Sequence, residues 1–179
     1  MRIVLAGLAA GVAMFVWSAI AHVATPLGTI GVSTLPNESV TVGNLASAIG
    51  DKGGLYLFPT SSGASPSSSA ATGPVGFLAF SPKAPTTMQP KNLVIEFLTE
   101  LAEGLIAAWL LAQTALSSYA ARAGFVTVLG LGAVITTNIS YWNWYNFLFD
   151  YTLGYGFVEF IGYVVAGLTA AAILKPKAG

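Results

Sequence analysis

Apolar residues gather in four long stretches of the chain, separated by polar or Gly- and Pro-rich segments. Each stretch has about the 20 residues that an α-helix needs to cross the hydrocarbon core of a bilayer. Backbone groups inside a bilayer must be hydrogen-bonded internally, so even the Gly-rich third stretch is predicted to be helical. The pattern predicts an all-α membrane protein with four transmembrane helices, at Ile3 to Thr25, Leu93 to Ser117, Ala123 to Ser140 and Tyr151 to Leu174.

The first stretch has an alternative interpretation. Arg2, an apolar run and the small-x-small triplet Ala19-Ile20-Ala21 are also typical of a secretory signal. The run is longer than the apolar part of most signals, which favours a transmembrane helix. The spacing of Gly7 and Gly11 in this stretch suits close packing against another helix.

The segment between the first two stretches has a different pattern. It contains residues that favour the two ends of a short helix, two short runs of apolar and aromatic residues, and a connection rich in Ser, Ala, Gly and Pro. We therefore expect a large loop that holds a short helix, a β-hairpin and a flexible connection, at residues 37–50, 54–58 with 75–80, and 60–74 respectively.

Basic residues predict the direction in which the chain crosses the membrane. Lys and Arg favour the cytoplasmic side in short connections. With both ends inside, four basic residues fall on that side: Arg2, Arg122, Lys175 and Lys177. The predicted organisation is N-in/C-in, with transmembrane helix 1 in residues 1–25, an outer loop in 26–90, and transmembrane helices 2–4 with a short cytoplasmic tail in 91–179. The low charge and short connections favour a bacterial inner membrane, with the long loop on the outer side.

Composition supports the membrane interpretation and excludes several kinds of function. Only 8% of the residues are charged, against about 25% in ordinary soluble domains. The mean hydropathy is +0.73. The net charge is zero and there is no basic run, so no nucleic acid is predicted as a partner. The chain has no cysteine, which excludes disulfides, thiolate nucleophiles and thiolate metal sites.

The second apolar stretch carries acids at a helical spacing. Glu96, Glu100 and Glu103 lie at i, i+4 and i+7, and so share one face of a helix. Ionisable residues inside a membrane are costly and usually face the interior of a bundle or a water-filled cavity. Hydration at the outer interface is the simpler explanation for Glu96, whereas Glu100 and Glu103 are predicted to lie deeper.

Polar residues of the other three stretches are predicted to lie in the outer half or near the midplane. Tyr155, Glu159 and Tyr163 recur every four residues and so form one stripe along a helix. The phenols of the two tyrosines can donate hydrogen bonds to the Glu159 carboxylate. His22 and Asn138 lie near the outer ends of the first and third stretches. No Lys or Arg is predicted at this depth. The acids must then be protonated, bind a cation, or meet basic residues of another subunit.

The residue types limit the chemistry of such a site. Carboxylates and imidazole together accept Zn, Mn or Fe, so a divalent cation is an open alternative. However, the chain has one histidine and no Glu-x-x-His or His-Glu-x-x-His motif, and no cofactor is predicted. No Gly-x-Ser-x-Gly elbow is present, so nucleophilic catalysis is poorly supported.

A dense group of aromatic residues follows the third stretch. Trp and Tyr favour the headgroup level of a bilayer, which predicts an interfacial anchor. The alternative is an aromatic wall for a lipid tail, a quinone or a pigment. The predicted aromatic belt comprises Tyr141, Trp142, Trp144 and Tyr145.

The layout of four helices, both ends inside and a large first outer loop with strand content resembles the claudin-like arrangement. The resemblance is one of topology. The Trp and Cys signature of the first loop in that family is absent, because this chain has no cysteine. No residue role is carried over from it.

Together these observations predict a non-enzymatic accessory or structural subunit of a larger membrane complex. Its partners would be the lipid bilayer and other membrane protein subunits, or copies of itself. The acids leave two alternatives open: a transport or cation/proton-binding module, and a membrane enzyme that uses them as acid and base on a lipid or quinone. Carboxylates that converge on one cavity would favour the alternatives, whereas carboxylates spread over outward faces would favour the subunit.

Overall fold

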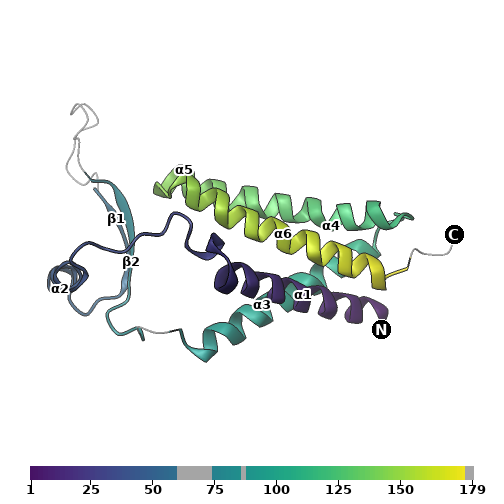
Figure 1. Cartoon of the computed structure of the whole chain (residues 1–179), viewed down its shortest axis with the longest axis horizontal. Coiled ribbons are helices and arrows are strands. Elements are labelled where there is room, and N and C mark those ends of the chain that lie inside the picture. The colour runs from purple at the N-terminus through teal and green to yellow at the C-terminus, as the bar shows by residue number, and fades with distance from the viewer. Residues whose placement is uncertain (60–73, 86–87, 176–179) are drawn as a thin grey trace.

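The computed structural model describes residues 1–59, 74–85 and 88–175 and is mostly helical (Figure 1). In these residues the long helices form one bundle, and the segment between α1 and α3 extends from one end of it. The bounds of the long helices are Arg2–Ala24 for α1, Pro90–Ala112 for α3, Tyr119–Val134 for α4 and Phe149–Ile173 for α6.

The long helices pack in a defined order. Helix α1 lies against both α3 and α6, and α4 lies against α6. The start of α1 and the end of α6 lie at the same end of the bundle, and the α1–α3 segment lies at the opposite end (Figure 1). This arrangement agrees with an even number of crossings.

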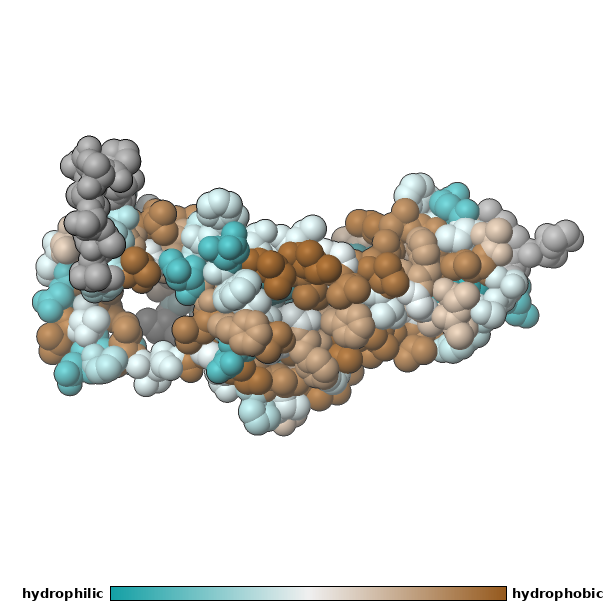
Figure 2. Space-filling model, turned by 90° about the horizontal axis from the view of Figure 1, so that it is seen from above, coloured by the Kyte–Doolittle hydropathy of each residue, from teal (hydrophilic) through white to brown (hydrophobic). Residues whose placement is uncertain are grey.

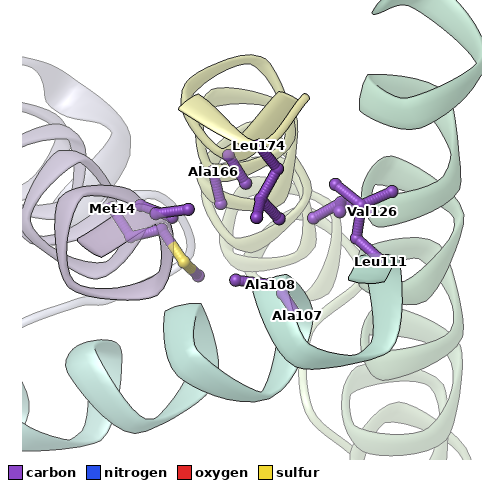
Figure 3. Packing of buried hydrophobic residues seen from close by; sticks show 10 residues of the cluster. Met14, Ala107, Ala108, Leu111, Val126, Ala166 and Leu174 are labelled. Carbon is purple, nitrogen blue, oxygen red and sulfur yellow. The ribbon is translucent and has the colours of Figure 1, made fainter. Parts of the chain in front are cut away.

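The buried core is built from small side chains. Its members come from all four long helices, and Val126 is the largest side chain that is fully buried among the described residues (Figure 3). Most of the large apolar side chains point outward instead, as Leu5, Val16 and Trp109 do, whereas Met14, Leu111 and Leu174 lie in the core. Figure 2 shows apolar residues over most of one face of the bundle, with hydrophilic residues near the two ends of the molecule. Small residues inside and large apolar residues outside are typical of helices that pack in lipid.

Three helices in the described residues are long and apolar enough to cross a membrane. They are α1, the continuous helix of residues 119–145, and α6. Helix α3 has a similar length, 23 residues. It differs because it contains Glu96, Glu100 and Glu103. Three charged residues are more than a membrane span of this length normally contains. Three of the four predicted spans are therefore supported by length and composition.

The predicted close packing at the glycines of α1 is confirmed. A Cβ atom built on Gly104 of α3 would lie against the backbone of Gly7 and Gly11. At this crossing the two backbones are in contact, so only glycine fits. The crossing aligns the glutamate-bearing half of α3 with the second half of α1.

The third predicted helix is longer than expected. It was predicted to end at Ser140, but helix continues through the π-helical segment η2 (Ile135–Ile139) into α5 (Ser140–Tyr145). Asn146 ends it in the left-handed conformation, with φ of 57°. Apart from glycine, residues with a short polar side chain such as Asn adopt this conformation most readily, which explains why the helix ends at this residue.

The α1–α3 segment contains the predicted helix and hairpin. After the short 3₁₀ helix η1 (Pro26–Thr29) come α2 (Glu38–Ile49) and the antiparallel strands β1 (Gly54–Phe58) and β2 (Gly76–Phe80). Asn37 precedes α2, but its side chain makes no capping hydrogen bond. The flexible connection predicted at 60–74 lies outside the described residues apart from Pro74. Phe77 of β2 packs on Tyr145 of α5, with ring centroids 4.8 Å apart.

Candidate functional site

A cavity of about 330 Å³ opens between α1, α3, η2 and α6, in the half of the bundle nearer the α1–α3 segment. Residues from four separate parts of the sequence meet in its wall. All eight polar residues predicted as candidate binding residues line it: His22, Glu96, Glu100, Glu103, Asn138, Tyr155, Glu159 and Tyr163. The carboxylates therefore converge on one cavity rather than spreading over outward faces.

Helix α3 supplies three of the carboxylates from a single face. Glu96 is exposed, Glu103 is half-buried and Glu100 is only 9% exposed. In the described part of the chain the Glu100 carboxylate has no hydrogen bond or ion pair, and the charged groups that act on it are those of Glu103 and Glu96. A buried carboxylate among other acids is unfavourable when charged unless a proton or a cation joins it.

Helix α6 supplies the fourth carboxylate and holds it with an amide. The Asn138 side-chain nitrogen donates to Glu159 Oε2 over 2.6 Å, and also to the Thr137 hydroxyl over 3.1 Å. Asn138 is 6% exposed, so this contact lies inside the bundle. Thr137 and Asn138 belong to η2. The wider turn of a π-helix shifts the register of the following side chains, which changes the face of the helix that Asn138 occupies.

The carboxylates of α3 and α6 approach one another through Tyr163. The Tyr163 hydroxyl interacts with the Glu103 carboxylate, and Glu103 and Glu159 line the same cavity. The Tyr163 side chain packs directly against Gly130 of α4, where a Cβ atom would overlap it. The absence of a side chain at residue 130 therefore makes room for the phenol at the cavity wall.

Helix α1 completes the wall. Trp17 Nε1 donates to the Val158 carbonyl oxygen of α6 over 2.8 Å, which fixes the two helices in register. His22 Nδ1 donates to the Ser18 carbonyl oxygen over 2.9 Å, since a carbonyl oxygen can only accept. The imidazole ring also meets the ring of Tyr155 edge to face, at 6.2 Å.

Aromatic rings form much of the remaining wall. Tyr151 and Tyr155 stack at 5.5 Å with an interplanar angle of 20°, and Tyr141 stacks with Phe147 at 5.4 Å. Of the predicted aromatic belt, only Tyr141 lines this cavity. The other three members, Trp142, Trp144 and Tyr145, lie outside it.

Sequence reasoning missed several lining residues. Met14, Trp17 and Ser18 lie one or two turns before His22 on the same helix, so the face that carries His22 was a usable signal. Thr137 and Phe147 gave no such signal, because one depends on the π-helix and the other on the turn after α5.

The charges in the wall are all of one kind. Among the described residues that line the cavity there are four glutamates, one histidine and no Lys or Arg. Nor do three His, Asp or Glu side chains of the described residues lie close enough together to hold one metal ion. The carboxylates are thus distributed around the wall and alternate with rings and amide or hydroxyl groups.

Comparisons of the chain with protein-family models, with curated proteins and with solved structures gave no match.

Proposed function

We propose that this chain is a membrane-embedded module that binds a small cation in the cavity and carries it across the membrane. One observation carries the proposal: Glu100, nearly buried, faces a cavity whose wall holds three more carboxylates and no basic residue other than His22. Ionised carboxylates in such a place are costly without a counter-charge. A bound cation would supply it.

The proposal includes four membrane crossings with both ends inside the cell. Helix α3 would be the fourth span. Its glutamates line the cavity instead of facing lipid, which explains why its composition differs from that of the other spans. Arg2, Arg122 and Lys175 gather at the end of the bundle that carries both chain termini, in agreement with a cytoplasmic location for that end. A bacterial inner membrane, with the α1–α3 segment outside, is the proposed setting.

The wall favours an organic cation, such as an amine or a quaternary ammonium ion. The cavity volume of about 330 Å³ is much larger than a bare metal ion and falls within the range of small-molecule pockets. The stacked pair Tyr151 and Tyr155 offers electron-rich ring faces, which attract cations of this kind. The distributed carboxylates would balance the charge without direct coordination.

Uptake into proteoliposomes tests the transport part of this proposal. Vesicles with the purified chain should accumulate radiolabelled tetraethylammonium, whereas the double variant Glu100→Gln/Glu159→Gln should take up at least tenfold less. Glu38→Gln in α2 is the matched control, because it removes a carboxylate outside the cavity and should leave uptake unchanged. Equal uptake by the double variant and the wild type would rule the cavity out as the route. Uptake of Mn²⁺ or protons but not of tetraethylammonium would support cation transport and would show that the ligand is not an organic cation.

An accessory subunit of a larger complex is the second candidate, and a separate observation favours it. Helix α2 has no buried residue, and the apolar side chains of Leu55 in β1 and of Val75, just before β2, are more than half exposed. Such a surface is typical of a segment covered by a partner. Gentle extraction from native membranes, followed by mass spectrometry of the intact assembly, separates the two candidates. Stoichiometric partner subunits would favour the accessory role, and a chain that runs alone or as a homo-oligomer would favour the cation module.

A membrane enzyme acting on a lipid or quinone is a third hypothesis, because it would use the same carboxylates.

A further inference from the structure

A second cavity, of about 240 Å³, lies at the end of the bundle that carries both chain termini, away from the acidic cavity. Three basic residues from distant parts of the sequence line it: Arg2 at the start of α1, Arg122 in the first turns of α4, and Lys175 just after α6. No described residue in its lining is acidic.

Arg122 is the unusual member of this group. It is only 5% exposed, and in the described part of the chain its side chain makes no hydrogen bond or ion pair. A guanidinium group is charged at every physiological pH. No fully buried nitrogen or oxygen in the described side chains lacks a partner, so the guanidinium nitrogens of Arg122 reach the open space of the cavity, where an anionic ligand can meet them.

Orientation in the membrane does not explain this burial. The preference of Lys and Arg for the cytoplasmic side requires only that they lie in a short connection, and an exposed side chain would serve equally well. The acidic residues of the chain do not satisfy Arg122 either. Four of them line the other cavity, and Glu38, Asp51 and Asp150 lie in or near the α1–α3 segment at the far end of the molecule.

The rest of the lining is apolar. Ile3, Leu116 and Leu174 contribute aliphatic side chains beside the cations. The one hydroxyl in the wall, that of Thr114, already donates to the Leu111 carbonyl oxygen over 2.8 Å. Three positive charges beside an aliphatic surface, at the end of a membrane helix bundle, match a phosphate group that is attached to an apolar body.

We propose that this cavity binds a phosphate group, which Arg122 contacts with its planar fork and which Arg2 and Lys175 neutralise further. The group can come from the headgroup of an anionic phospholipid or from a soluble phosphate. The aliphatic side chains favour the phospholipid. This site is independent of the cation cavity, since the two share no lining residue.

Native mass spectrometry of the full chain, released from nanodiscs, tests the proposal. Wild type should retain phosphatidylglycerol at least tenfold more strongly than phosphatidylcholine, and Arg122→Gln should lose this preference. Lys91→Gln is the matched control, because Lys91 is exposed in the first turn of α3 and does not line the cavity. Two further variants guard against misfolding: Lys175→Gln changes an exposed residue, and Arg122→Lys keeps the charge but removes the bidentate fork. Both should weaken retention of phosphatidylglycerol.

Titration with inorganic phosphate separates the two sources. Stabilisation of the wild type by inorganic phosphate that is lost in Lys175→Gln and Arg122→Lys, without any preference for phosphatidylglycerol, would support a phosphate site and assign it to a soluble ligand. If neither phosphatidylglycerol nor inorganic phosphate distinguishes the wild type from these variants, the proposal is wrong.

Discussion

Asn138 donates a 2.6 Å hydrogen bond to Glu159, and this contact joins the π-helical segment η2 to α6 inside the bundle. It places an amide donor on one of the four carboxylates of the cavity. Glu159 is thus held by the protein itself, whereas Glu100 has no such partner in the described residues. The two acids would therefore have different roles: Glu159 is oriented by the fold, and Glu100 is left for the ligand.

Replacing Asn138 should weaken the bundle. Asn138→Ala leaves the Glu159 carboxylate without its donor, and we expect a loss of about 1 kcal/mol in the free energy of unfolding, as is usual for hydrogen bonds between membrane helices. Unfolding in mixed detergent micelles measures it. Asn143→Ala removes an exposed amide of α5 and is the control. Equal losses in both variants, or strict additivity of Asn138→Ala with Glu159→Ala, would contradict a specific contact.

The crossing of α1 and α3 makes a second prediction about stability. Gly104→Ala places a Cβ atom against the backbone of Gly7 and Gly11, so it should cost about 1–3 kcal/mol by overpacking. Gly132→Ala is the matched control, because a Cβ atom there meets no atom within 4 Å. It should be neutral or slightly stabilising, since alanine favours helix. Thermal unfolding of the two variants checks the difference, and equal melting temperatures would mean that the helices do not approach this closely.

The absence of cysteine makes the proposed topology directly testable. Ser47→Cys in α2 and Ser117→Cys between α3 and α4 introduce single thiols at exposed positions. If α3 crosses the membrane, a thiol reagent that cannot cross membranes should label intact cells at residue 47 and should label residue 117 only after permeabilisation. Labelling of both residues in intact cells would show that α3 does not cross.

The aromatic wall makes a prediction about ligand class. Tyr155→Ala removes a ring that stacks on Tyr151, and should weaken tetraethylammonium binding by roughly 0.5–2 kcal/mol, while Tyr155→Phe keeps the ring and most of the affinity. Tyr145→Ala, outside the cavity, is the control. Equal affinities of Tyr155→Ala and Tyr155→Phe for tetraethylammonium would show that the ring faces do not contribute to binding.

The helical elements could be predicted because their patterns are local. Apolar length predicted the ends of the long helices to within five residues, the largest differences being the end of α3 at Ala112 instead of Ser117 and the end of the third helix at Tyr145 instead of Ser140. The spacing of Glu96, Glu100 and Glu103 predicted their common face. The number of membrane crossings is less clear from the sequence. The same three glutamates that form the face of α3 also reduce its resemblance to a span.

Features that depend on contacts between helices were harder to predict from the sequence. Nothing local in residues 135–139 predicts a π-helix, so the pairing of Asn138 with Glu159 could not be foreseen. The room for Tyr163 depends on Gly130 of another helix. The basic residues were assigned to orientation alone, because burial of Arg122 arises only when three distant segments meet.

Equilibrium binding tests the central claim most directly, because it does not depend on transport or on partners. Isothermal titration of tetraethylammonium into the purified chain should give saturable binding at one site. The variant Glu100→Gln/Glu159→Gln should bind at least tenfold more weakly, and Glu38→Gln should bind like the wild type. Loss of affinity confined to the double variant is the result that this account predicts. If the wild type and the double variant bind tetraethylammonium, Mn²⁺ and protons alike, the acidic cavity is not a cation site.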